Sequence, residues 1–227
     1  MMKALKATGK PLVFVNMSGG AMGFEWEAAN ANAIIQAWYG GQSGGQAVAD
    51  VLFGDYNPSG RLPVTFYKNV ADLPDFEDYS MENRTYRYFK GVPLYPFGFG
   101  LSYTNFQYKK LKTGPLSKNS KNGLKVTIQV KNTGKKAGDE VVQLYVSHKN
   151  APFKTPIRAL KGFQRIALKA GESRFLTFNL RGKDLSVLDV DGKPNVFQGE
   201  TEISVGGSQP SEAAILEKKV VQKMVKM

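Results

Sequence analysis

The sequence contains no cysteine and a single histidine, His148, among its 227 residues. Without cysteine it forms no disulfide and offers no thiolate ligand to a metal. A single histidine rules out a metal site formed by several histidines within this chain. His148 follows a strand-like run, where we expect it to be partly exposed. The residues therefore predict no metal centre, and nothing in them indicates a cofactor.

Long apolar runs are also missing. No stretch of 18 apolar residues occurs, so the sequence predicts no segment that spans a membrane. The first residues, "MMKALKATGKPLVFVNMSGG", carry early lysines and an apolar run, as secretion signals do. That run, "PLVFV", has five residues, fewer than the ~7–15 of a signal core. We interpret it as a buried strand.

Acidic residues are scarce in the second half. Residues 101–227 hold 23 Lys and Arg against 10 Asp and Glu, whereas residues 1–100 hold 8 against 9. The net charge of +12 therefore belongs to the second half, and the shift predicts a boundary near residue 100. The lysines are spread over turns and strands without the interleaved aromatics of single-strand nucleic-acid binders. We expect a solvated basic surface and no nucleic-acid partner.

Alternating strand and helix patterns predict an α/β unit in the first half. Leu12 to Asn16 is a continuous apolar run, as expected of a strand covered on both faces. After a glycine-rich turn, residues 25–36 have helix-like apolar spacing, although "AIIQAW" at 33–38 also suits a second short strand. Residues 46–52 predict a further helix. Two strands cannot bury both faces of a doubly wound sheet, so we expect the sequence to enter an α/β domain midway.

The second half has the pattern of an all-β domain. Runs such as "LKVTIQVKNTG", "EVVQLYVSH" and "TEISVGG" alternate apolar and polar residues over strand lengths, and turn signals such as "KAGES" separate them. In the first run, Leu124, Val126, Ile128 and Val130 share one face. Short strands at this spacing predict a β-sandwich, without the disulfide of antibody domains.

No stretch offers catalytic chemistry by itself. The loops "SGGAMG" and "GGQSGGQ" precede helices, where backbone N–H groups can bind phosphate, but neither fits a phosphate-binding consensus, so we interpret them as tight turns. Glu25 and Glu27 flank Trp26, yet residues two apart on a helix do not converge on one atom. The acidic residues 75–84 lack the ligand spacing of a calcium loop.

Four long motifs, in order and spacing, resemble the C-terminal region of glycoside hydrolase family 3. They are "GGQSGGQAVADVLFGDYNPSGRLPVTFY", "NRTYRYFKGVPLYPFGFGLSYTNF", "VKNTGKKAGDEVVQLYV" and "LKGFQRIALKAGES". The resemblance implies an α/β fold followed by an all-β fold. Residues 1–68 would be the end of the family's α/β sandwich domain, with an incomplete parallel sheet. Residues 69–100 would be a linker and interdomain junction, and residues 101–227 an immunoglobulin-like fibronectin type III β-sandwich.

The same resemblance implies where the chemistry of such an enzyme lies. Family members begin with a (β/α)₈ barrel that carries an aspartate nucleophile, and the acid/base glutamate often comes from the upstream part of the α/β domain. The retaining mechanism needs two carboxyl groups roughly 5–5.5 Å apart. No residue of this sequence matches either group, so we assign no catalytic residue and expect the chain alone to be inactive. Its expected partner is the N-terminal part of the same enzyme.

Loops at the ends of strands are where open α/β sheets bind ligands. "NMSGGAMGFEW" follows the Leu12–Asn16 run, so Ser18, Glu25 and Trp26 are the candidate substrate-binding residues.

The segment "LYPFGFGLSYTNF" at 94–106 combines aromatics with glycines and a proline. It resembles the family's junction between the two domains. Aromatic side chains bury large areas and glycines permit bends, so Tyr95, Phe97, Phe99 and Tyr103 are predicted to pack between the domains. A sugar-stacking platform is the alternative.

Two classes of function remain open from the sequence. The resemblance implies the C-terminal part of an exo-acting, retaining β-xylosidase or β-glucosidase that acts on plant-type oligosaccharides, in a parent enzyme that is periplasmic or secreted. The alternative is a non-catalytic module that binds carbohydrate or nucleic acid. Salt dependence would distinguish the second, because phosphate binding weakens steeply with salt.

Overall fold

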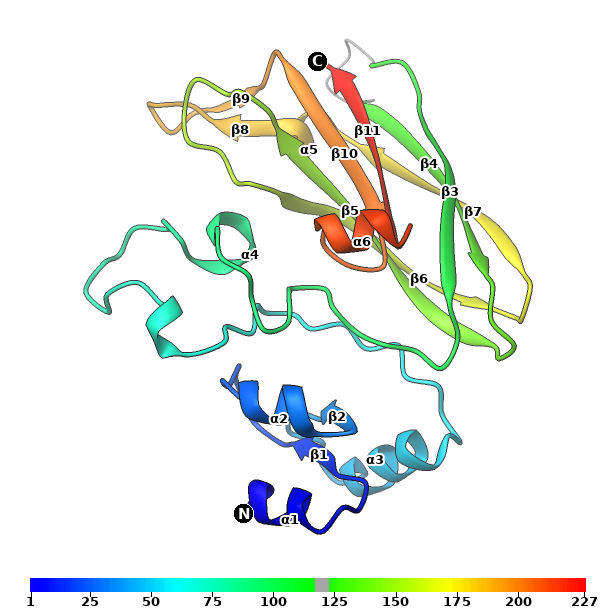
Figure 1. Cartoon of the computed structure of the whole chain (residues 1–227). Coiled ribbons are helices and arrows are strands. Elements are labelled where there is room, and N and C mark those ends of the chain that lie inside the picture. The colour runs from blue at the N-terminus through cyan, green and yellow to red at the C-terminus, as the bar shows by residue number, and fades with distance from the viewer. Residues whose placement is uncertain (117–122) are drawn as a thin grey trace.

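The computed structural model describes residues 1–116 and 123–227 and shows two units of different architecture (Figure 1). A small α/β segment lies at one end, and a β-sandwich formed by the second half lies above it in the view. An extended stretch, with the short helices η1 (Val70–Asp72) and α4 (Thr85–Tyr88), connects them. The predicted fold class, α/β followed by all-β, is confirmed.

The α/β segment contains two parallel strands and three helices. Strand β1 (Val13–Asn16) pairs in register with β2 (Ala33–Gln36), Val13 opposite Ala33 and Asn16 opposite Gln36. Helix α1 (Met2–Ala7) precedes β1, α2 (Glu25–Asn30) joins the strands, and α3 (Gly44–Phe53) follows β2. Of the two interpretations of residues 25–36, the combination of a short helix and a strand is therefore the observed one.

Backbone geometry explains two of these boundaries. Ala31, after α2, adopts an extended conformation, which stops the helix and lets the chain enter β2. Helix α3 ends where Gly54 takes a left-handed conformation with φ of 85°, a region that glycine enters without a steric penalty.

The sandwich consists of a four-stranded and a three-stranded sheet. The first has the order β11 (Val220–Lys226), β10 (Glu200–Gly206), β5 (Gly138–His148), β6 (Ala159–Leu168), and the second has the order β3 (Phe106–Thr113), β4 (Leu124–Asn132), β7 (Ser173–Leu180). All neighbouring pairs are antiparallel. Strands β3 and β11 were not predicted, because their lysine-rich sequences alternate only weakly.

The remaining elements of the sandwich are short. Helix α5 (Gly182–Leu185) leads into a hairpin of β8 (Ser186–Leu188) and β9 (Pro194–Val196). Helix α6 (Glu212–Leu216) lies between β10 and β11, and its first turn is capped by the Ser211 hydroxyl, which accepts from the N–H of Ala214. No helix in the described ranges is long and apolar enough to cross a membrane.

Strand alternation decides which side chains enter the sandwich core. The predicted inward face of β4 is confirmed, since Leu124, Val126, Ile128 and Val130 are fully buried. On β5, Val142, Leu144 and Val146 point into the same core. The intervening residues of β5, including Gln143 and Tyr145, face the opposite way, toward the connecting stretch. The outer face of this sheet is thus the surface on which the first half of the chain packs.

Candidate functional site

A small polar cluster lies at the carboxyl ends of β1 and β2. Asn16 and Gln36 are the last residues of their strands and stand opposite each other in the register. The Asn16 side-chain amide donates to Gln36 Oε1 at 2.6 Å and to Ser18 Oγ at 3.0 Å. The Ser18 hydroxyl in turn donates to the carbonyl of Gly20 at 2.8 Å. The cluster therefore fixes the glycine-rich loop that follows β1.

The three predicted substrate-binding residues occupy different places. Ser18 belongs to the cluster and is partly buried. Glu25 is the first residue of α2 and is exposed, whereas Trp26 is half-buried, and its carbonyl accepts from the Asn30 side chain. No hydrogen bond in the described part of the chain joins the side chains of Glu25 or Trp26 to Ser18. Whether these residues contact substrate stays a prediction.

Two further residues of this site were missed by sequence reasoning. Asn16 and Gln36 appeared only as the polar ends of apolar runs. The signal that identifies them is that each terminates a strand, and the carboxyl ends of parallel strands meet at one edge of a sheet. Amide and hydroxyl groups both donate and accept hydrogen bonds, which suits the hydroxyls of a sugar. Within the described residues, no group of three or more His, Asp or Glu side chains is placed to hold a metal ion.

The aromatic segment 94–106 contacts elements from both units. Phe97 stacks on Tyr86 of α4 with ring centroids 4.1 Å apart, and Tyr86 meets Tyr145 of β5 edge-on at 6.2 Å. Tyr95 packs against Phe24 at 5.9 Å and against Phe99 at 5.2 Å. Tyr86 thus links Phe97 to the surface of the sandwich, whereas the contact between Tyr95 and Phe24 lies against the α/β segment.

Tyr103 behaves differently from the other three aromatics. It is 44% exposed, its hydroxyl donates to the carbonyl of Val51 in α3, and Lys136 lies 5.6 Å from its ring centroid. Its contacts thus reach α3 on one side and the turn between β4 and β5 on the other.

A buried ion pair joins the connecting stretch to the sandwich. Arg61 Nη2 lies 2.7 Å from Glu140 Oε1, and the two side chains are 9% and 4% exposed. Arg61 Nε also donates to the carbonyl of Gly207, which follows β10. Burial raises the pKa of Glu140 above its ordinary value, and the Arg61 guanidinium opposes this rise by stabilising the carboxylate.

An amide adjoins this ion pair on the outer face of the sheet. Gln143 Nε2 donates to the carbonyls of Gly98 at 3.0 Å and Gly207 at 2.9 Å, and its Oε1 accepts from the Tyr145 hydroxyl. Gly98 has a φ of 77°, and a Cβ there would overlap Gln143 Oε1, so this close approach requires glycine. Burial raises the pKa of Tyr145, which keeps its hydroxyl protonated as a donor.

We expect Phe97→Ala to lower the free energy of unfolding by about 2–3 kcal/mol, less than the ~3–5 kcal/mol of a fully enclosed phenylalanine, because the ring is half-buried. Thermal or urea unfolding measures the change. Phe76→Ala is the matched control, since that ring is 93% exposed, and its effect should stay within about 0.5 kcal/mol. Equal effects of the two substitutions would contradict a packing role for Phe97.

Comparison with known families now defines the class of protein. The glycosyl hydrolase family 3 C-terminal domain matches residues 1–103, and the fibronectin type III-like domain matches residues 140–209. Both units of the fold therefore correspond to domains that occur together in glycosidases. The chain belongs to glycoside hydrolase family 3.

Relatives and solved structures agree with this assignment. A xylan 1,4-β-xylosidase of Xylanibacter ruminicola is 48% identical over 208 residues, which are 91% of this chain and 24% of the relative. A periplasmic β-glucosidase of Salmonella typhimurium is 37% identical over 91% of this chain and 28% of its own length. The crystal structure of a Bifidobacterium adolescentis family 3 β-glucosidase superposes on all of this chain with a TM-score of 0.85 at 31% identity, over 34% of that protein. The chain thus spans about a quarter to a third of the proteins it matches.

Proposed function

We propose that this chain is the C-terminal portion of an exo-acting, retaining β-xylosidase or β-glucosidase of family 3. The observation that carries the proposal is the 48% identity to a xylan 1,4-β-xylosidase along 91% of the chain, across both units. The periplasmic relative likewise supports an exported parent enzyme.

In this proposal the chain shapes the substrate pocket and supplies no reacting group. Retaining glycosidases use one carboxyl group as nucleophile and another as acid and base, roughly 5–5.5 Å apart. We assign neither role to a residue of this chain. Its contribution is the polar cluster of Asn16, Ser18 and Gln36, which holds the loop after β1 and offers donors and acceptors to sugar hydroxyls.

The distribution of apolar side chains supports a partner for the first 103 residues, which form the α/β segment and the connecting stretch. Among the described residues, 18 large apolar side chains are exposed in 1–103, against nine in 104–227. Only four apolar residues of the first region are buried, namely Leu12, Phe24, Phe66 and Phe89. This region therefore has little apolar core of its own, whereas the β-sandwich has an extensive one. We infer that the N-terminal part of the same enzyme, including further strands of the sheet, covers this surface.

The purified chain should not hydrolyse aryl β-xylosides or aryl β-glucosides above a buffer blank, because the nucleophile and the acid/base residue lie elsewhere in the proposed enzyme. Release of nitrophenol by the chain alone measures this. Turnover that a substitution within this chain abolishes would refute the proposal.

The complementary experiment uses the chain within a complete family 3 enzyme, with the N-terminal domains of the Xylanibacter xylosidase fused before residue 1. Hydrolysis should appear, and Gln36→Ala should reduce kcat/KM by about tenfold, because the loop that Gln36 supports loses its anchor. Gln222→Ala, which removes one hydrogen bond between β10 and β11, is the matched amide control and should leave kcat/KM unchanged.

A further inference from the structure

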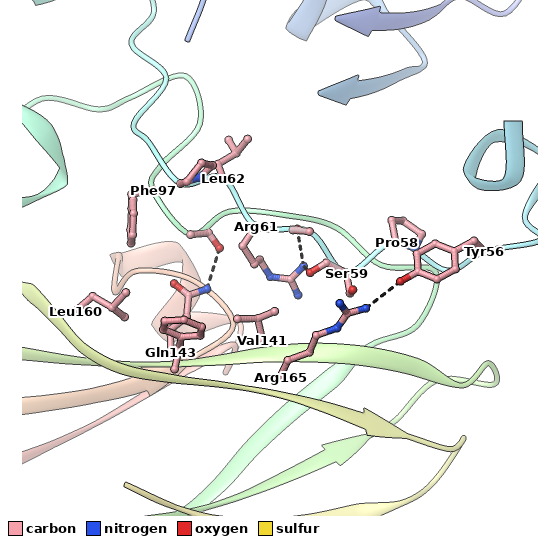
Figure 2. A pocket seen from close by; sticks show the side chains of 14 residues that line it. Tyr56, Pro58, Ser59, Arg61, Leu62, Phe97, Val141, Gln143, Leu160 and Arg165 are labelled. Carbon is pink, nitrogen blue, oxygen red and sulfur yellow. Dashed lines mark hydrogen bonds between the residues drawn. The ribbon is translucent and has the colours of Figure 1, made fainter. Parts of the chain in front are cut away.

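A cavity of about 480 Å³ lies on the outer face of β5 and β6 (Figure 2). Two cross-strand pairs form its floor, Val141 with Arg165 and Gln143 with Phe163. The stretch from Tyr56 to Pro63 and the turn at Phe97 and Gly98 form its walls. The cavity shares no lining residue with the cluster of Asn16, Ser18 and Gln36, and its volume is typical of small-ligand sites, about 300–1,000 Å³.

Two aromatic rings border the cavity and are open to solvent. Phe163 is 67% exposed and Tyr56 is 48% exposed. An aromatic face that a protein leaves open beside polar groups offers a surface on which the C–H face of a sugar ring can stack.

Hydrogen bonds hold Arg165 and Tyr56 in place at the cavity, and both side chains keep hydrogen-bonding groups that a ligand can use. Arg165 Nε donates to Asp139 at 2.8 Å and Nη2 donates to the Tyr56 hydroxyl at 2.9 Å, while Nη1 has no hydrogen-bond partner in the described part of the chain. The Tyr56 hydroxyl accepts this bond and keeps its own proton for a ligand. The hydroxyl of Ser59 lies in the wall, where the residue is 5% exposed, and has no partner among the described residues.

We propose that this cavity binds one neutral pyranose unit of an oligosaccharide, independently of hydrolysis. The hydroxyls of Ser59 and Tyr56 and the guanidinium of Arg165 provide the donors and acceptors that sugar hydroxyls need, and the open aromatic rings provide the stacking surface. A neutral sugar fits better than an acidic one, because the carboxylate of Asp139, 2.7 Å from Arg165 Nη2, already compensates the guanidinium charge.

The test is calorimetric titration of the full chain with xylotriose and cellotriose. We expect saturable binding of one sugar molecule per chain. Phe163→Ala should weaken this binding by about tenfold. Phe175→Ala is the matched control, since Phe175 is a 60% exposed phenylalanine on β7 that does not line the cavity, and it should change the affinity less than about twofold.

A second pair of variants tests the polar contacts. Arg165→Lys removes the planar guanidinium, whereas Arg174→Lys makes the same change at the arginine that pairs with Glu172 on the other sheet. Only the first should weaken binding. Melting curves verify that every variant is folded, and if Phe163→Ala is not, the arginine pair decides the question.

Three outcomes would overturn the proposal. They are no saturable binding of either trisaccharide, binding that neither Phe163→Ala nor Arg165→Lys weakens, and binding that Gln36→Ala abolishes while the cavity variants leave it intact. The last outcome would locate the sugar at the ends of β1 and β2. None of these results depends on whether the chain takes part in hydrolysis, so the two proposals can fail separately.

Discussion

Arg61→Ala should lower the free energy of unfolding by about 3–5 kcal/mol, because it leaves the carboxylate of Glu140 buried without its cation. The carbonyl of Gly207 loses a donor in the same step. Urea unfolding followed by circular dichroism measures the difference. Arg174→Ala is the control, since both partners of the Arg174–Glu172 pair are substantially exposed, and that loss should stay below about 1 kcal/mol.

The loss in Arg61→Ala should depend on pH with a defined sign. Burial already raises the pKa of Glu140 in the folded chain, and without Arg61 it rises further. A carboxyl group whose pKa is higher in the folded than in the unfolded chain contributes most to the free energy of unfolding below its unfolded pKa. That contribution is lost as the pH rises through the folded pKa. The variant should therefore be closer to the parent at about pH 4 than at about pH 7.5.

Glu140→Gln provides the test of this mechanism. In the Arg61→Ala background, Glu140→Gln removes the buried negative charge that has lost its cation. The double variant should therefore recover part of the lost stability at neutral pH. A deficit in Arg61→Ala that is equal at both pH values, and that Glu140→Gln leaves unchanged, would show that packing and not charge accounts for the loss.

Phe66→Ala should destabilise the α/β segment by about 3–5 kcal/mol, the cost of emptying a fully enclosed phenylalanine site. Phe66 has no exposed surface, and its ring meets Phe24 at 5.7 Å and Trp38 at 6.1 Å. Its backbone also pairs with Tyr95. Since this segment has few other buried apolar residues, we expect the substitution to unfold it while the sandwich remains folded.

Limited proteolysis and amide hydrogen exchange distinguish the two units. In the parent chain the first cuts should fall within residues 1–92, because the two-stranded sheet has open edges, and a resistant C-terminal fragment should remain. Phe66→Ala should accelerate those cuts without changing exchange in β4 and β5. Phe53→Ala, at an 84% exposed ring, should leave the pattern unchanged. An α/β segment that outlasted the sandwich would contradict this picture.

Much of the sandwich could be predicted because its information is local. A strand has only two faces, and in β4 and β5 one face carries the apolar side chains. That face turns toward the core, so the alternation in the sequence predicts the orientation of each strand. The lysine-rich strands β3 and β11 were missed because pairing with β4 and β10, and not their own pattern, makes them strands.

The sequence by itself determined the family and the order of the two units, because motif identity and binary patterning are readable along the chain. Only the tertiary structure decided which side chains meet across long separations. It joined Asn16 to Gln36, Arg61 to Glu140, and Tyr56 to Arg165. These pairs depend on strand register and on where the connecting stretch crosses the sheet, and those are fixed by burial of the whole core rather than by any short segment.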